Sequence, residues 1–237
     1  MKCAPAVFAL LTLSIPTLAA AQTTPGAVAE ATGLDGRSFF PPALSAEAKQ
    51  RLEDNLKAAA AEVAKNPGSA DALVWKGRRL AYLSRYHEAI DVFTQGVTKF
   101  PGDARFHRHR GHRLITTRKF DLAVLDFERA AALMQGRPDE GEPDGAPGKR
   151  PSPSSTLKFN IYYRLGLAHY LKGDFEKALA AYQECMKYSR DNDDSLVATS
   201  DWLYMTLRRL GRKADADRVL EPIHEGMQVL DNSAYYL

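Results

Sequence analysis

Hydrophobic residues recur at helical spacing over most of the chain, beginning near residue 44. In the first such segment the apolar positions follow at intervals of three or four residues, which places them on one face of a helix. These positions are Leu52, Leu56, Ala59, Ala60 and Val63. Ser45 precedes them as an N-cap, with Glu47 in the first turn and Lys65 in the last, as the helix dipole favours. We therefore expect a lone capping helix over residues 44–66.

The helical pattern is itself repeated along the chain. Gly77 and Gly111 lie 34 residues apart, and each is followed by an aromatic residue after nine positions, an alanine after twelve and a phenylalanine after sixteen. A third copy begins at Gly166, with tyrosine in the last position, and a weaker fourth begins at Tyr204. The residues that follow are Tyr86, Ala89 and Phe93, then Phe120, Ala123 and Phe127, then Phe175, Ala178 and Tyr182, then Lys213, Ala216 and Leu220. Self-similarity at such a period is typical of stacked helical repeats.

The residue types of this repeat have physical reasons. Glycine within a helix costs about 1 kcal/mol relative to alanine, so a recurrent glycine indicates that two helices approach closely there. The alanine twelve residues on is the expected small contact on the second helix, and the aromatic residues would fill the space between pairs. Breaks at Ser84-Arg85, Lys172-Gly173-Asp174 and Leu210-Gly211-Arg212 predict turns between paired helices.

These positions resemble the tetratricopeptide repeat (TPR), a helix-turn-helix unit of about 34 residues. The residues that carry the resemblance in the first unit are Gly77, Tyr86, Ala89, Phe93 and Pro101. It covers about residues 70–223 and implies an all-α fold, an α-solenoid of antiparallel helix-turn-helix (TPR-like) repeats. Units 1 and 2 would occupy residues 70–134, and units 3 and 4 with a C-terminal helix would occupy 156–237. Unit 4 departs from the family, because Lys213 replaces the aromatic residue and Pro222 breaks or ends its second helix.

The first 21 residues have the pattern of a cleavable signal peptide. Met1-Lys2 gives a positive start, an apolar stretch follows, and Ala19-Ala20-Ala21 offers small residues for cleavage. A membrane-spanning anchor is the alternative, but the stretch is shorter than the roughly 20 apolar residues that a bilayer requires, and Pro16 interrupts it. We therefore expect residues 1–21 to be removed, leaving no integral membrane segment, and periplasmic or secreted localisation.

Residues 22–43, which follow, are typical of an extended N-terminal tail that Phe39-Phe40-Pro41-Pro42 would pin to the stack. Cleavage would also remove Cys3, so Cys185 would be the one remaining cysteine and no internal disulfide could form. Because Cys185 falls at a small-residue position of the repeat, we expect a buried structural thiol.

An insertion rich in proline and glycine separates units 2 and 3, over residues 135–155. Its composition excludes a helix, and insertions in repeat proteins fall on one edge of the stack. The segment contains the acidic residues Asp139, Glu140, Glu142 and Asp144. We predict that this acidic run folds back over a basic groove as an internal, competing ligand; the alternative is a solvated spacer.

Overall charge argues against nucleic acid as the partner, because 32 basic and 29 acidic residues give only +3. In the family that the chain resembles, the first helix of each unit lines a concave face where peptides bind. The positions that this register turns inward, and that we predict to bind a ligand, are Arg78, Tyr82, Arg105, Arg108, His112, Tyr163, Tyr170 and Arg208. Arginine forks beside tyrosines suit a protein or peptide with an anionic segment, whereas the alternative is a solvated helix face. The lysines and asparagines of the family's carboxylate clamp are not matched.

Other chemistries are less well supported by the sequence. His107, His109 and His112 suggest a metal site, but neighbouring arginines would repel a cation, and the acidic loop lacks the spacing of a calcium site. We find no catalytic motif and predict no enzyme activity and no cofactor. The alternative is an accessory hydrolytic enzyme that uses His112 with Asp201 or Asp71 across the groove. RNA binding through the arginine-rich helix is a third hypothesis, disfavoured by export. The sequence does not indicate an oligomeric state.

Overall fold

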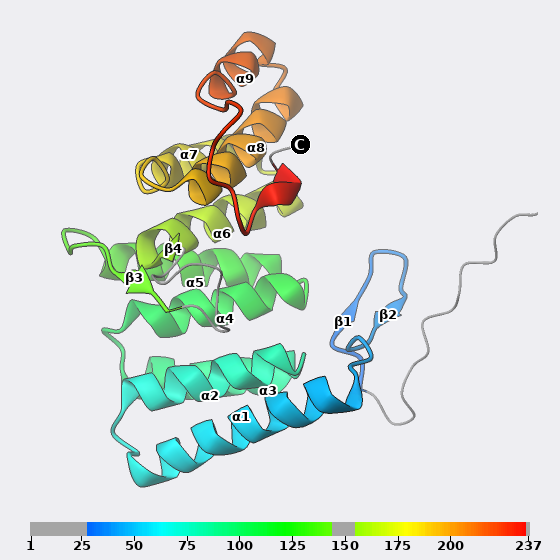
Figure 1. Ribbon diagram of the computed structural model, residues 1–237, viewed down its shortest axis with the longest axis vertical. Coiled ribbons are helices and arrows are strands. Elements are labelled where there is room, and N and C mark those ends of the chain that lie inside the picture. The colour runs from blue at the N-terminus through cyan, green and yellow to red at the C-terminus, as the bar shows by residue number, and fades with distance from the viewer. Residues whose placement is uncertain (1–27, 144–154, 236–237) are drawn as a thin grey trace, which may run out of the picture.

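The computed structural model describes residues 28–143 and 155–235, and the helices there follow one another along a stack from α1 to α9 (Figure 1). The helices are α1 (Ala46–Lys65), α2 (Ala70–Tyr82), α3 (Tyr86–Lys99), α4 (Ala104–Thr116), α5 (Phe120–Leu133), α6 (Leu157–Lys172), α7 (Phe175–Met186), α8 (Asp193–Arg209) and α9 (Lys213–Val219). Each packs on the next in the sequence, and α2, α4, α6 and α8 also contact one another in turn. The predicted all-α solenoid is confirmed.

Each helix pair begins and turns in the same way. Short polar side chains cap the first helices, since Ser69, Asp103, Thr156 and Asn192 each accept a hydrogen bond from a backbone N–H in the first turn. The turns to the second helices place one residue in the left-handed region, with φ of 58° at Ser84, 62° at Arg118, 84° at Gly173 and 74° at Gly211. Each of these lies seven positions after the first residue of a repeat, so the predicted turns, including that of the weak fourth unit, are present.

The recurrent glycines lie where a ring of the second helix packs against the first. A Cβ atom at Gly111 would come within 2.9 Å of the Phe127 ring, and one at Gly166 would come within 2.6 Å of Tyr182. Gly77 faces Phe93 in the same way. The aromatic residue sixteen positions on is therefore what the glycine accommodates, rather than the alanine that we expected, although the alanines are fully buried as well. The three rings are nearly fully buried and anchor successive parts of the core.

The N-terminal segment differs from the extended tail that we predicted. Strands β1 (Ala31–Thr32) and β2 (Ser38–Phe39) pair antiparallel as a hairpin beside the stack (Figure 1). Phe39 and Phe40 do not pin it, because they are 50% and 40% exposed. The carboxylate of Glu30 does so instead, accepting hydrogen bonds from the backbone N–H groups of Tyr86 (2.9 Å) and His87 (3.1 Å) at the start of α3. That helix has no side-chain cap of its own, so Glu30 supplies one.

The C-terminal helix that we predicted is also not formed. The short α9 ends at Val219, and the described chain beyond it folds back to a single 3₁₀ turn, η1 (Ser233–Tyr235). The reason lies in α8, where Asp194 accepts hydrogen bonds from the backbone N–H groups of Leu230 (3.0 Å), Asp231 (2.8 Å) and Asn232 (2.8 Å). These contacts fix the segment against the stack, so its backbone donors serve Asp194 rather than a helix.

Cys185 is fully buried, and its thiol lies 3.5 Å from the hydroxyl of Thr199. Burial raises the pKa of this thiol to about 12, so it is protonated at neutral pH, as a structural cysteine should be. Over the described ranges, no helix has both the length and the apolar character to cross a membrane. The predicted signal peptide lies outside the described residues.

Candidate functional site

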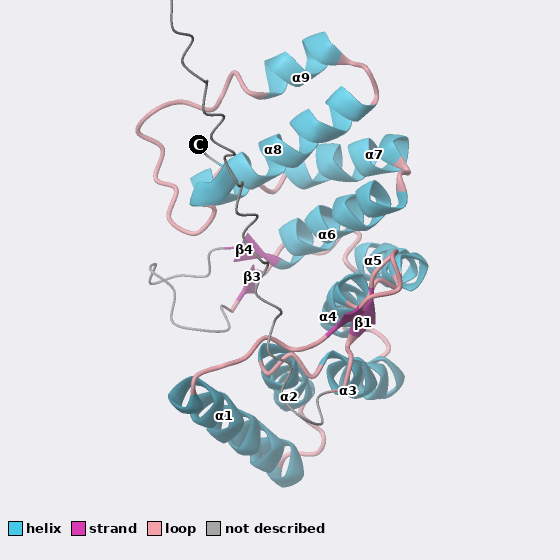
Figure 2. Ribbon diagram, turned by 90° about the vertical axis from the view of Figure 1, so that its right-hand side faces the viewer, coloured by secondary structure: helices cyan, strands magenta, loops and turns pink. Residues whose placement is uncertain are grey.

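One side of the stack is formed by the first helices of the pairs. Figure 2 shows α2, α4, α6 and α8 along that side, with α3, α5 and α7 along the other. The strands β3 (Gly141–Glu142) and β4 (Ser155–Thr156) lie on the side of the first helices and pair antiparallel with each other. This arrangement brings the insertion to the helix face that the repeat register predicted to be the binding face.

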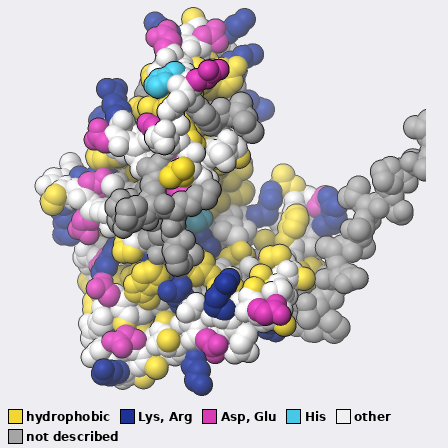
Figure 3. Space-filling view, viewed as in Figure 1, with side chains coloured by type: hydrophobic (Ala, Val, Ile, Leu, Met, Phe, Trp, Pro, Cys, Tyr) yellow, Lys and Arg dark blue, Asp and Glu magenta, His cyan; other side chains and the backbone are white. Residues whose placement is uncertain are grey.

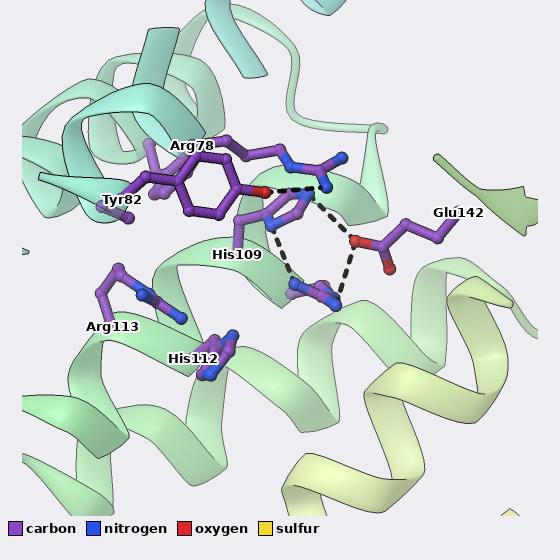
Figure 4. A pocket seen from close by; sticks show the side chains of 9 residues that line it. Arg78, Tyr82, His109, His112, Arg113 and Glu142 are labelled. Atoms are coloured by element: carbon purple, nitrogen blue, oxygen red, sulfur yellow. Dashed lines mark hydrogen bonds and ion pairs between the residues drawn. The ribbon is translucent and has the colours of Figure 1, made fainter. Parts of the chain in front are cut away.

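A cavity of about 130 Å³ opens between α2 and α4, and β3 borders it. Its lining residues are Arg78, Ala81, Tyr82, Phe93, Arg108, His109, His112, Arg113 and Glu142. Figure 4 shows Arg78 and Tyr82 of α2 at the top of the cavity and the labelled side chains of α4 below them. On the face drawn in Figure 3, basic side chains lie beside hydrophobic ones in the lower half of the stack. The cavity therefore combines aromatic walls with guanidinium groups.

Glu142 supplies the one carboxylate of this lining. Its side chain is buried and forms an ion pair with Arg108 at 3.0 Å, lies 3.4 Å from His109, and accepts a hydrogen bond from Asn160 at 3.1 Å. Arg78 donates to the main-chain oxygen of Pro143 at 2.7 Å. The insertion thus folds back onto the groove, as predicted, and one acidic residue of the run makes the contact (Figure 4).

Burial and positive neighbours set the charge state of the cavity. Burial lowers the pKa of Arg108 and of Arg113 to about 10, a value at which both remain charged at neutral pH. Burial, with the nearby arginine charges, lowers the pKa of His109 and His112 well below its usual range, so both imidazoles are neutral at pH 7. The site is therefore an arginine site in which the histidines act as neutral polar groups.

Arg113 lines this cavity and Arg164 lines a second one, which Asp194 and Asp231 also line; neither arginine forms an ion pair with a carboxylate among the described residues. Arg113 packs over the ring of Tyr86, with 5.5 Å between its guanidinium carbon and the ring centre, and Arg164 of α6 lies 5.7 Å from that of Tyr163. The Nε atom of Arg164 is buried and has no hydrogen-bond partner within those residues. The charge of Arg164 contributes to the low pKa of both His112 and Arg113, so it belongs to the same electrostatic cluster. Buried guanidinium groups normally have an anionic partner.

The structure brings together Arg78, Tyr82, Arg108 and His112 of the eight predicted site residues. Arg105 is partly buried but already paired, with Asp71 at 2.5 Å and Asp103 at 2.6 Å, so it serves the start of α4 rather than a ligand.

The other three predicted residues lie outside the cavity. Tyr163 is buried and lines a second cavity of about 240 Å³ between α6, α8 and η1. Tyr170 packs edge-on against Phe175 and Trp202. Arg208 donates to the hydroxyl of Tyr204 at 2.7 Å on α8. For these positions the prediction of a shared ligand surface has no support in the geometry.

Sequence reasoning missed Arg113, Arg164 and His109 as parts of the site, whereas it placed Glu142 at the basic groove as one of four acidic residues of the insertion. A signal for two of them was present in α4, where the basic positions follow the spacing of a helix stripe, i, i+3, i+4, i+7 and i+8. Those positions are Arg105, Arg108, His109, His112 and Arg113. Arg164 directly follows the inward position Tyr163, so a wider arc of the helix would have included it.

Neither alternative chemistry gains support from the geometry. His107 is used structurally, since its Nδ1 lies 2.8 Å from Asp126, which Arg110 also binds. In the part of the chain that the structure describes, no group of three or more metal-ligating residues comes together. Asp71 is paired to Arg105, and neither Asp71 nor Asp201 lines the cavity with His112.

Comparisons with known proteins agree with this helical-repeat class. Models described as tetratricopeptide repeat match residues 43–104, 76–143 and 159–192, which together are more than half of the chain. The chain therefore belongs to the tetratricopeptide repeat family. This membership supports the prediction that the protein is a scaffold for protein–protein interaction.

Individual relatives are distant. The chain is 25% identical over 159 residues to the Small glutamine-rich tetratricopeptide repeat-containing protein 2 of Saccharomyces cerevisiae, covering 67% of this chain and 39% of that protein. It thus spans about two fifths of that relative's length. A crystal structure of MamA matches with a TM-score of 0.57 and 15% identity, covering 74% of this chain and 88% of MamA. MamA of Desulfovibrio magneticus matches with a TM-score of 0.55 and 18% identity, covering 74% and 86%. These similarities establish the fold alone.

Proposed function

We propose that this TPR protein binds an acidic segment of a partner protein in the groove of α2, α4 and α6, at the arginine cluster of Arg78, Arg108, Arg113 and Arg164. The observation that carries the proposal is that Arg113, which lines the cavity beside Arg108, forms no ion pair with a carboxylate among the described residues. Arg164 lines the second cavity with Asp194 and Asp231 but forms no ion pair with them, its buried Nε has no hydrogen-bond partner in the described chain, and its charge acts on Arg108. Arg113 and Arg164 are half-buried. Withdrawing a guanidinium group from water without counter-charge costs free energy, and a ligand carboxylate would recover it.

The chemistry of the lining favours an acidic peptide over a small metal complex or an uncharged ligand. Arginine binds carboxylates through two parallel hydrogen bonds, and the aromatic walls from Tyr82 and Phe93 would pack against the aliphatic parts of a peptide. Because the first helices contact one another in turn, the groove continues from one unit to the next, as an extended segment requires.

We also propose that the chain is exported and meets its partner outside the cytoplasm, on the strength of the signal-peptide pattern in residues 1–21. Mass spectrometry of the protein recovered from the envelope or medium should give a mature chain that begins at Gln22. Recovery of intact protein beginning at Met1 would contradict export and leave the groove proposal untouched.

The binding proposal is tested with the pentapeptide amide Asp-Glu-Gly-Glu-Pro, labelled with fluorescein at its N-terminus, against the equally labelled Asn-Gln-Gly-Gln-Pro, whose side chains are uncharged. Arg164→Met should weaken binding of the acidic peptide by about tenfold or more, because a hydrogen bond to a charged group contributes about 1.5 to 3 kcal/mol. The same substitution removes an uncompensated buried charge, so the melting temperature should stay level or rise. Loss of binding without loss of stability would mark Arg164 as a ligand residue.

Arg208→Met is the matched control, because Arg208 lies on α8 outside the cavity and bonds only Tyr204 among the described residues. It should leave peptide affinity within about twofold of the wild type. Equal affinity of the wild type for the acidic and uncharged peptides would contradict the proposal. Tighter, salt-sensitive binding of a single-stranded RNA pentamer would overturn it in favour of nucleic acid.

A further inference from the structure

We propose that Glu142 and Pro143 form an internal ligand of the groove, and that the partner binds by placing an acidic residue of an extended segment where Glu142 now lies. The inference rests on the proposed function, and it adds the conformation of the partner's segment and the competition that the partner must overcome.

The contacts of Glu142 are those that a bound peptide residue would make. Its carboxylate is held by three groups from two helices, Arg108 and His109 of α4 and Asn160 of α6. The following main-chain oxygen, that of Pro143, accepts from Arg78 of α2. An acidic side chain and the next backbone oxygen are thus bound together, so the groove recognises a main-chain geometry as well as a charge. Figure 4 shows the carboxylate of Glu142 in this position.

The backbone around Glu142 is extended, which defines the conformation that the partner should adopt. Gly141 pairs with Thr156 and Glu142 with Ser155 in the β3–β4 ladder. The segment is anchored near α6 as well, because the N–H of Leu157 donates to the oxygen of Glu140 at 2.8 Å. A segment tethered this closely has a high effective concentration at the groove, so a partner in solution competes against an intramolecular contact.

The other described acidic residues of the insertion do not share this role. Asp139 accepts hydrogen bonds from the backbone N–H groups of Glu140 (2.9 Å) and Lys158 (3.0 Å), so it fixes the loop at the start of α6. The Glu140 side chain is exposed and makes no contact with the arginines. The contact is therefore specific to Glu142, and Glu140 provides a control of equal charge on the same loop.

Glu142 compensates only part of the positive charge of the arginine cluster. Its carboxylate forms an ion pair with Arg108, whereas Arg113 and Arg164 form none with a carboxylate of the described chain, although Asp194 and Asp231 line the second cavity with Arg164. A partner with two or more acidic residues gains contacts that the internal segment cannot supply. This difference is what would allow the partner to displace a tethered competitor.

The test measures binding of the labelled Asp-Glu-Gly-Glu-Pro peptide, the sequence of residues 139–143, to full-length protein by fluorescence anisotropy. Glu142→Gln removes the competing charge and should bind the peptide about tenfold or more tightly than the wild type, because the apparent dissociation constant scales inversely with the fraction of open groove. Glu140→Gln should bind like the wild type. Glu142→Ala, which empties the position of the carboxylate, is the second variant and should bind at least as tightly as Glu142→Gln.

The outcomes separate this inference from the proposed function. If Glu142→Gln and the wild type bind the peptide with equal, measurable affinity, competition is excluded while the groove proposal stands. If both Glu142 variants bind more weakly than the wild type, Glu142 belongs to the recognition surface and the inference is overturned. If neither variant nor the wild type binds the peptide at all while far-ultraviolet circular dichroism is native, both proposals fail. If Glu140→Gln binds the peptide as much more tightly as Glu142→Gln does, the gain in affinity comes from the charge of the loop, which would contradict a specific contact of Glu142.

Discussion

Three arginines in one groove differ in what faces them. Arg108 has Glu142 at 3.0 Å, whereas Arg113 and Arg164 pack near the rings of Tyr86 and Tyr163 and form no ion pair with a carboxylate of the described chain. A ring can attract a cation, but by less than a carboxylate in the same position. The neutral histidines between these arginines separate the charges without cancelling them. At the scale of single residues, the groove therefore carries more positive than negative charge.

The histidines give the groove a pH dependence of stability with a defined sign. Above about pH 6.5, His109 and His112 are neutral in both the folded and the unfolded chain, so they contribute no slope. Below that pH the histidines of the unfolded chain bind protons. In the folded chain they stay neutral, because burial and the charges of Arg108, Arg113 and Arg164 oppose protonation of His112. The free energy of unfolding should therefore decrease as the pH is lowered below about 6.5, by up to about 1.4 kcal/mol per pH unit for each histidine.

Urea denaturation at pH 7, 6 and 5 measures this slope. His112→Gln should make this slope shallower than it is in the wild type. An equal slope in the two proteins would contradict burial of a neutral His112.

Helix pairs are held by a contact between glycine and an aromatic ring. The two columns lie sixteen residues apart, and Gly77, Gly111 and Gly166 each face the ring of their own unit. Such a contact joins the two helices of a pair, and it is local in sequence, which explains why the periodicity of the chain discloses it. The turn at the seventh position in each unit is local for the same reason.

Gly111→Leu should destabilise the protein by about 1 to 3 kcal/mol, because the new side chain overpacks against the fully buried ring of Phe127. Gly102→Leu is the control, since a Cβ atom there meets nothing within 4 Å. Thermal and urea unfolding of both variants measure the difference. Equal stability of the two would remove the argument that the glycine column marks helix contacts.

Elements outside the repeats could not be predicted, because contacts from distant parts of the chain determine them. Glu30 caps a helix 56 residues away, and this contact makes the N-terminal segment a docked hairpin rather than an extended tail. Asp194 binds backbone groups 36 to 38 residues further on, and these replace the C-terminal helix by a single turn. A single carboxylate in each segment carries no periodic signal, so no pattern in the sequence indicates its partner.

At the scale of the whole molecule, the sequence predicts the stack of helix pairs and which residues of the first helices face inward. It predicts only some of the residues that line the cavity. The repeat register correctly directs Arg78, Tyr82, Arg108 and His112 into one cavity. It cannot distinguish an inward residue that is already paired, such as Arg105, from one that is free to bind a ligand. Nor does it include a side chain one position off the inward row, such as Arg164.

The insertion is the feature that joins these scales. It lies between units 2 and 3, its strands β3 and β4 pair with each other, and its Glu142 forms an ion pair with Arg108. Its acidic run predicted the contact with the basic face, but which of its carboxylates would reach Arg108 depends on the β3–β4 register. The molecule is therefore a TPR stack in which an acidic residue of the insertion lies on the face formed by the first helices.

The most direct test of the account is a double-mutant cycle between Arg164→Met and acidic peptides in which each carboxylate is replaced, one at a time, by its amide. The account predicts a coupling of at least about 1 kcal/mol with one of the three acidic positions, since a charge-assisted hydrogen bond is lost by either change alone. Coupling below about 0.3 kcal/mol at all three positions, in proteins that remain folded, would contradict binding of an acidic segment by the unpaired arginines.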